Sequence, residues 1–149
     1  MISQRTILYV EDEEGDVLLF RLAFTRACLP NPVQIAVDGA EAIDYLAGNG
    51  PFADRTQHPL PALVLLDLNL PKKSGFEVLS WVRQQPQFSS LPVVIYTSSV
   101  GLIDKDTAQL LGATDYYIKR SDVNHIAELA RSLTERWLPH IIMNEAASS

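Results

Sequence analysis

The sequence predicts an α/β protein with an open, five-stranded parallel sheet that is covered by helices on both faces. Short β-branched apolar runs alternate with longer helical patterns five times along the chain. The middle runs are continuously apolar, which is typical of parallel strands buried on both faces. Strand and helix repeated in this way imply right-handed crossovers and a doubly wound sheet. The length of 149 residues suits one domain with a substantial core.

Each element has its own signal in the chain. The predicted strands are TILYV (6–10), VQIAV (33–37), ALVLLD (62–67), PVVIYT (92–97) and DYYIK (115–119). The predicted helices lie near residues 15–28, 39–48, 75–85, 101–111 and 122–138. Asp122 is the expected N-cap of the last helix. That helix carries one apolar stripe at helical spacing, made of Ile126, Leu129, Ala130, Leu133 and Trp137.

Composition and charge exclude several classes of protein. Apolar residues make up 47% and charged residues 20% of the chain, a globular balance. The net charge of -6 and the lack of a basic stripe argue against a nucleic-acid partner. The apolar run LPALVLL is far shorter than the roughly 20 residues of a membrane span. Cys28 is the only cysteine, which fits a reducing cytoplasm, and we expect it to be buried on a helix.

Polar side chains stand where four of the predicted strands end. Asp67 ends the third strand, and Glu11 and Asp12 follow the first. Thr97 ends the fourth strand and Lys119 the fifth. Ligands of open parallel sheets bind at this carboxyl edge. The sequence therefore brings three carboxylates, a hydroxyl and an ammonium to one edge.

This set of groups points to phosphoryl transfer with a metal ion. Clustered carboxylates raise one another's pKa unless a cation lies among them, and an oxygen-rich shell suits Mg²⁺. No Cys or His is near enough in sequence to indicate zinc. A carboxylate can also take a phosphoryl group as an acyl phosphate, with a metal, a lysine and a hydroxyl to neutralise the phosphoryl oxygens. Asp67 is the candidate nucleophile.

Four motifs together resemble the receiver domain of a two-component response regulator. They are YVEDEEGD, DLNLP, YTSS and YYIK, in the family's order and spacing, and the resemblance covers residues 5–138. It implies a flavodoxin-like fold with strand order 2-1-3-4-5. A narrower resemblance, to the single-domain response regulators of cyanobacterial phytochromes, rests on the insert GNGPFADRTQHPLP, on DLNLPKKSG, on YIKRSD and on a late Trp137 and Leu138.

The resemblance implies a metal site and a phosphoacceptor. Glu11 and Asp12 resemble the metal-binding acidic pair, and Asp67 resembles the phosphoacceptor. Asn69 resembles the residue whose backbone carbonyl completes the metal shell. The implied cofactor is Mg²⁺ or another divalent cation such as Mn²⁺. The implied phosphoryl donor is a phosphohistidine of a sensor histidine kinase of the phytochrome type.

The resemblance also implies a switch. Thr97 resembles the switch hydroxyl, Lys119 the phosphate-pairing lysine and Tyr116 the rotating aromatic residue of the last strand. Such a protein is not a turnover enzyme, although it catalyses its own phosphorylation and dephosphorylation. In most receivers a proline follows the lysine, whereas Arg120 stands here. Because a cis bond before a non-proline residue costs about 3 kcal/mol, we expect a differently shaped trans loop or a strained cis one.

Three other classes remain as alternatives. The missing proline favours a pseudo-receiver, which would act as a phosphorylation-independent interaction module. An aspartate-nucleophile hydrolase resembles the pattern less, because Asn69 stands where that class has a second acid. A nucleotide or flavin binder needs a Gly-rich first loop, and the loop EDEEGD would repel phosphate without a metal.

The end of the chain suggests self-association. We assign residues 1–140 to the receiver domain and 141–149 to a C-terminal tail. Apolar residues of the last helix and tail exceed what the core needs, and they are Leu129, Leu133, Trp137, Leu138, Ile141, Ile142 and Met143. Surplus apolar surface marks interaction sites. We expect a twofold homodimer through the last helix, the last strand and the C-terminal segment, with a tail folded over its own domain as the alternative.

Overall fold

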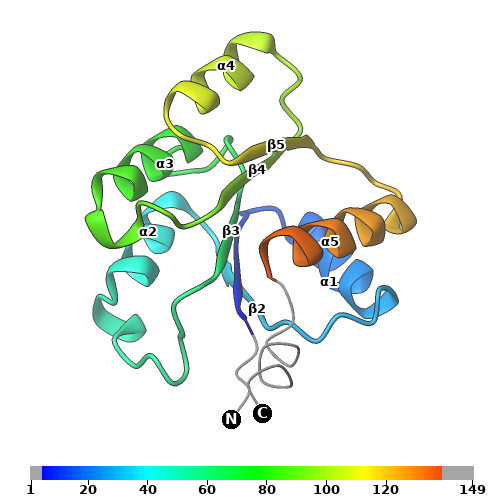
Figure 1. The fold of residues 1–149 in the computed structure, drawn as a ribbon, viewed down its shortest axis with the longest axis horizontal. Helices are drawn as coiled ribbons and strands as arrows, with labels where there is room; N and C mark the ends of the chain where they lie inside the picture. The colour runs from blue at the N-terminus through cyan, green and yellow to red at the C-terminus, as the bar shows by residue number, and fades with distance from the viewer. Residues whose placement is uncertain (1–4, 139–149) are drawn as a thin grey trace.

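The computed structural model describes residues 5–138, and Figure 1 shows one parallel sheet between two layers of helices. The strands lie in the order β2-β1-β3-β4-β5, so the predicted fold class is confirmed. The strands are β1 (Ile7–Val10), β2 (Val33–Ala36), β3 (Leu63–Leu66), β4 (Val93–Thr97) and β5 (Asp115–Ile118). The helices are α1 (Glu14–Arg26), α2 (Gly39–Ala47), α3 (Gly75–Gln84), α4 (Leu102–Leu110) and α5 (Val123–Trp137). Predicted and observed bounds agree to within two residues.

Every strand pair is parallel, and the central strands are buried on both faces. Leu8 and Val10 of β1 point to one core with α2, α3 and α4, whereas Ile7 and Tyr9 point to a second core with α1 and α5. This alternation follows from the two-residue period of a strand. Full burial of one such aliphatic side chain contributes about 1.5–3 kcal/mol. Strands β1 and β3, whose residues are all buried, are therefore held firmly in the sheet.

Side chains cap three of the helices at their N-termini. The Asp38 carboxylate accepts from Glu41 N–H at the start of α2, and Ser74 forms a capping box with Glu77 at the start of α3. Asp122 accepts from Asn124 N–H at the start of α5, which confirms the predicted cap. Helix α4 starts after Gly101, which has no side chain to cap it.

The Gly-rich and Pro-rich insert before β3 is ordered and packs against the C-terminal end of α2. It contains a 3-10 turn at Gly50–Phe52. The Arg55 guanidinium donates to the carbonyl oxygens of Tyr45 and Leu46, at 2.8 and 2.9 Å, and so satisfies the last turn of α2. The Tyr45 hydroxyl donates to Pro59 O at 2.8 Å. The sequence did not predict this docking.

Cys28 is exposed, and the prediction that it is buried on a helix was wrong. Helix α1 ends at Arg26, two residues before the predicted end. Cys28 then has a φ of 56°, in the left-handed region that follows many helix ends, and the turn directs its side chain to solvent.

Helix α5 uses its apolar stripe to seal the core beside α1. Leu133 and Leu138 are buried, which removes them from the expected surplus of apolar surface. Most of the large exposed apolar side chains in residues 100–138 lie on and before α4, and they are Val100, Leu102, Ile103 and Leu110, with Ile118 on β5 as a further one. The tail at 141–149, which the dimer prediction also used, lies outside the described residues.

Within residues 5–138, every helix is too short or too polar to cross a bilayer.

Candidate functional site

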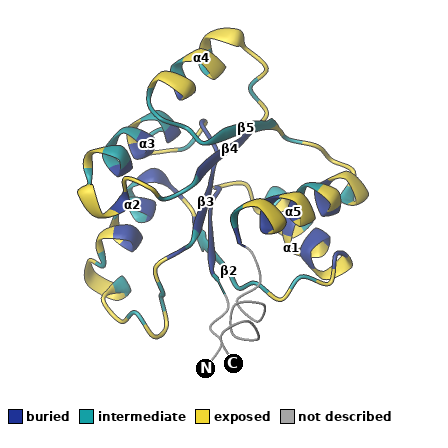
Figure 2. Cartoon of the chain, in the orientation of Figure 1, coloured by how far each residue is buried: buried dark blue, intermediate teal, exposed yellow. Residues whose placement is uncertain are grey.

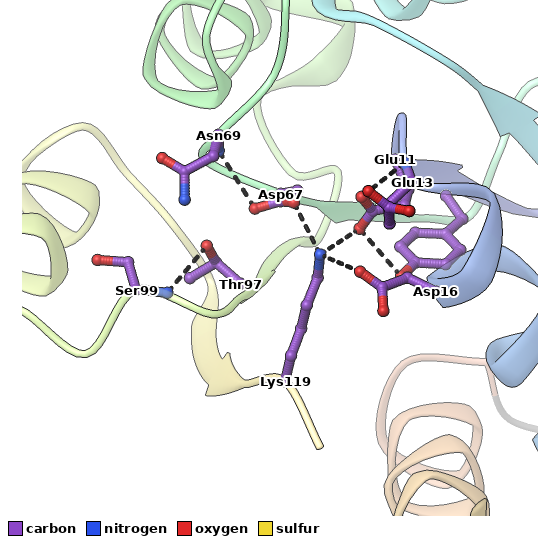
Figure 3. Close-up of polar contacts among 9 residues, drawn as sticks. Glu11, Glu13, Asp16, Asp67, Asn69, Thr97, Ser99 and Lys119 are labelled. Carbon is purple, nitrogen blue, oxygen red and sulfur yellow. Dashed lines mark hydrogen bonds and ion pairs between the residues drawn. The ribbon is translucent and has the colours of Figure 1, made fainter. Parts of the chain in front are cut away.

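The carboxyl edge of the sheet brings most of the predicted site residues together, and Figure 3 shows Glu11, Asp67, Asn69, Thr97 and Lys119 there. Asp67 directly follows β3, and Glu11 and Asp12 directly follow β1, the neighbouring strand. Thr97 is the last residue of β4, and Lys119 follows β5. The parallel sheet places these strand ends on one edge, and the long Lys119 side chain reaches from the end of β5 to Glu11, although β3 and β4 lie between β5 and β1.

Three carboxylates form the centre of the site. One oxygen each from Glu11, Asp12 and Asp67 can be chosen so that all lie within 4.8 Å of one another. Glu11 is 1% exposed and Asp67 is 3% exposed, whereas Asp12 faces solvent. Such a set of hard oxygen donors, open on one side, fits a divalent cation of the Mg²⁺ type.

The loop after β3 holds Asp67 in place through close backbone packing. The Asn69 N–H donates to Asp67 Oδ1 at 3.2 Å. Gly75, at the start of α3, lies so near the loop that an added Cβ would come within 2.2 Å of the Asp67 carbonyl oxygen. Any larger residue at position 75 would displace the loop that carries Asp67.

The Lys119 ammonium is the cation that balances this cluster. Its Nζ lies 2.6 Å from Glu11 Oε1, 2.8 Å from Asp16 Oδ2 and 2.9 Å from Asp67 Oδ2. Burial lowers the pKa of Lys119, but the hydrogen bonds to Asp16, Glu11 and Asp67 outweigh it and hold the pKa above its usual value. The ammonium is therefore charged at neutral pH.

The Lys119–Arg120 bond is trans, as no peptide bond within residues 5–138 is cis. The Lys119 N–H donates to Thr97 O at 2.8 Å, which continues the β4–β5 ladder by one residue. The first of the two expected geometries, a trans loop, is thus the one observed. The lysine reaches Asp67 without a proline after it.

Glu11 is the most strongly perturbed acid of the site. Burial, followed by the charge of Asp67, raises its pKa to about 7, although Lys119 opposes the shift. The Tyr9 hydroxyl donates to Glu11 Oε1 at 3.3 Å, and the Glu13 N–H donates to Oε2 at 3.1 Å. A second positive charge at this edge would favour the ionised form of Glu11.

Comparisons with known proteins agree with this geometry. The family model of the response regulator receiver domain matches residues 7–131. The chain belongs to the response regulator receiver family. It is 30% identical over 142 residues to Response regulator Rcp1 of Synechocystis sp., covering 95% of both chains.

Two solved receivers resemble the chain closely. One is the phosphorylated cyanobacterial phytochrome response regulator RcpA, with 32% identity, a TM-score of 0.82, and coverage of 91% of this chain and 95% of the other. The other is the Mn²⁺-bound form of Rcp1, with 31% identity, a TM-score of 0.78, and coverage of 90% and 94%. The narrower resemblance to single-domain phytochrome response regulators is thereby confirmed.

In this receiver, the two predicted switch residues are joined through a third. The Ser99 N–H donates to Thr97 Oγ1 at 3.3 Å, and the Tyr116 hydroxyl donates to Ser99 O at 3.0 Å. Thr97 is buried, and Tyr116 is half-buried. A shift of the Thr97 hydroxyl would therefore move the Ser99 backbone, and with it the hydrogen bond between the Ser99 carbonyl oxygen and the Tyr116 hydroxyl.

Sequence reasoning missed two residues of this receiver site, Ser99 and Asp16. Ser99 contributes backbone atoms, for which its residue type gives no signal. Asp16 lies in the first turn of α1. Acids are common there because the helix dipole favours them, so its residue type gives no signal of a role at the site. Its contact with Lys119 spans 103 positions and depends on the fold.

Proposed function

We propose that this receiver accepts a phosphoryl group on Asp67 from a phosphohistidine of a sensor histidine kinase of the phytochrome type. The observation that carries the proposal is the Asp67 carboxylate itself. It is held at the end of a buried strand, with two further acids on one side and an ammonium 2.9 Å from Oδ2. The kinase type is inferred from the similarity to RcpA and Rcp1.

In the proposed reaction, a carboxylate oxygen of Asp67 attacks the phosphorus of the donor. The O–P bond forms as the P–N bond to the donor imidazole breaks, and the electron pair of the P–N bond returns to the imidazole nitrogen. Lys119 neutralises a phosphoryl oxygen as charge develops. Hydrolysis of the acyl phosphate by water restores the carboxylate, so the protein acts as a switch and not as a turnover enzyme.

A divalent cation belongs to this proposal. Glu11, Asp12 and Asp67 would hold it through carboxylate oxygens, together with the Asn69 backbone carbonyl. When bound, Mg²⁺ or Mn²⁺ supplies charge neutralisation on the phosphoryl oxygens. The three carboxylates already converge without a ligand, because the ends of β1 and β3 fix their positions.

The output is proposed to follow from the Thr97 hydroxyl. A phosphoryl group on Asp67 adds charge and acceptor oxygens, and Thr97 would turn toward them. Its bond with Ser99 N–H would then break, and the Tyr116 ring would be released from Ser99 O. The surface around α4 and β5 would change as a shift between two states.

The pseudo-receiver remains the rival function. Its support was the arginine after Lys119, which put the position of the lysine in doubt. The trans loop nevertheless delivers the ammonium to Asp67. That contact favours the phosphorylated switch over an inert interaction module.

The homodimer also remains a proposal, through α5, β5 and the C-terminal segment. In the described part of the chain, Ile118 of β5 is a partly exposed apolar side chain that could contribute. Leu133 and Leu138 could not, since they are buried within one chain. A sedimentation mass of two chains at tens of micromolar is expected, and a mass of one chain with and without phosphorylation would defeat the idea.

Intact mass tests the phosphorylation proposal. The protein is incubated with acetyl phosphate and Mg²⁺, beside the Asp67→Asn variant and the matched Asp106→Asn variant, whose side chain is exposed on α4. We expect a gain of one phosphoryl group in the wild type and in Asp106→Asn, dependent on Mg²⁺, and none in Asp67→Asn. No gain in any protein would favour the pseudo-receiver. A gain that persists in Asp67→Asn would place the acceptor elsewhere.

A further inference from the structure

Among residues 5–138, Asp16 is the one partner of the Lys119 ammonium that stands apart from the candidate metal ligands. Its Oδ2 lies 2.8 Å from Nζ, within hydrogen-bond distance. The other two partners, Glu11 and Asp67, belong to the group of converging carboxylates, and Asp16 does not. Figure 3 shows Asp16 and Asp67 approaching the ammonium from different elements, α1 and the end of β3.

The ammonium and a divalent cation would compete for the same oxygens. A cation held by Glu11, Asp12 and Asp67 would weaken two of the three ion pairs of Lys119, those with Glu11 and Asp67. Phosphorylation of Asp67 then replaces its carboxylate with an acyl phosphate. In the described part of the chain, Asp16 is the one carboxylate contact of Lys119 that takes part in neither event.

The backbone around Lys119 does little to fix the position of its side chain. Its N–H makes the last bond of the β4–β5 ladder, and the next three residues, 120–122, are exposed and outside helix and strand. A lysine side chain carries about 2 kcal/mol of rotamer entropy, which favours release to solvent when its partners are lost. The helix that carries Asp16, by contrast, is anchored in the core by Phe20 and Phe24.

We propose that Asp16 is a positioning residue, which keeps the Lys119 ammonium beside Asp67 while Glu11 and Asp67 are engaged by the cation and the phosphoryl group. Its effect on phosphorylation rests on the proposed function of Asp67. Its effect on the lysine does not, because the ion pair exists without any phosphoryl group. Asp16 thus acts through Lys119 and touches no reacting atom.

The first arm of the test observes the ammonium directly. Lysine NH₃⁺ signals are recorded by ¹H–¹⁵N NMR in Mg²⁺, with Lys119→Arg used to assign the Lys119 signal. We expect a resolved Lys119 signal in the wild type, its loss or broadening in Asp16→Ala, and its return in Asp16→Glu. The control is Glu14→Ala, which removes an equal charge from the same helical turn and should leave the signal unchanged. An unchanged signal in Asp16→Ala would overturn the proposal.

The second arm measures the rate of phosphoryl gain from acetyl phosphate with Mg²⁺. Asp16→Ala should slow the reaction severalfold in the wild-type background and have no further effect in a Lys119→Gln background. Equal slowing in both backgrounds would show that Asp16 acts by another route, and would overturn the proposal. If the wild type gains no phosphoryl group, the proposed function fails, and the NMR arm still decides the role of Asp16.

Discussion

Helices α4 and α5 both pack beside β5, yet they differ sharply in how they are held. Figure 2 shows several buried patches on α5, whereas α4 is coloured exposed over most of its length. Five residues of α5 are buried, namely Ile126, Ala127, Ala130, Leu133 and Thr134, whereas Ala108 is the buried residue of α4. An Asp122 cap starts α5, and α4 starts at a bare Gly101.

This difference gives the two helices different parts in the proposed switch. An element with few buried side chains and no cap is displaced at a low cost in free energy. Helix α4 follows directly on the Thr97–Ser99 segment, so a change at Asp67 reaches it over a short path. Helix α5 packs with α1, which carries Asp16, and so belongs to the rigid half that holds the site.

The largest expected effect compares one leucine from each helix. Leu133 on α5 is 1% exposed and Leu110 on α4 is 88% exposed. Leu133→Ala should lower the free energy of unfolding by about 3 kcal/mol through the cavity it leaves. Leu110→Ala should change it by less than about 0.5 kcal/mol. Urea titrations of both variants measure the difference, and similar losses would contradict the comparison.

A smaller loss is expected from Lys119→Met in the presence of EDTA. The change leaves the buried carboxylates of Glu11 and Asp67 without their cation, at a cost of about 2 kcal/mol in the free energy of unfolding. Adding Mg²⁺ should recover most of this loss, because the metal replaces the missing charge. The control is Lys105→Met, an exposed lysine of α4. If both variants unfold alike in EDTA, the Lys119 ion pairs contribute nothing to stability.

The smallest of these effects concerns the cap of α5. Asp122→Ala removes the acceptor for Asn124 N–H and should lower the free energy of unfolding by about 1 kcal/mol. The neighbouring Ser121→Ala serves as the control, since Ser121 is exposed and precedes the cap. Thermal unfolding of both variants is sufficient to measure this. A loss of equal size in Ser121→Ala would show that the loop, and not the cap, was weakened.

The sequence predicted the fold and the positions of the main site residues for a simple physical reason. Strand ends are visible as the points where an apolar run meets a polar residue, as at Asp67 and Thr97. In a parallel sheet those points share one edge, so their convergence needs no knowledge of side-chain packing. The metal-type cluster of Glu11, Asp12 and Asp67 therefore followed from the sequence.

The remaining features depend on contacts between distant parts of the chain. Asp16 meets Lys119 only because the long lysine side chain reaches from the end of β5 to the first turn of α1. The docking of Arg55 on the carbonyl oxygens of α2 depends on the path of a long insert. The exposure of Cys28 depends on a helix that ends two residues early, and helix ends are weakly specified by propensity.

Amide hydrogen exchange of α4 and α5, before and after phosphorylation, tests the central claim most directly. Intact mass is measured on the same sample, with Asp67→Asn as the control. We predict that the phosphoryl gain changes exchange in residues 97–118 and leaves α5 unchanged, and that Asp67→Asn shows neither effect. A full phosphoryl gain with no change around α4, or with equal changes in α4 and α5, would contradict the account.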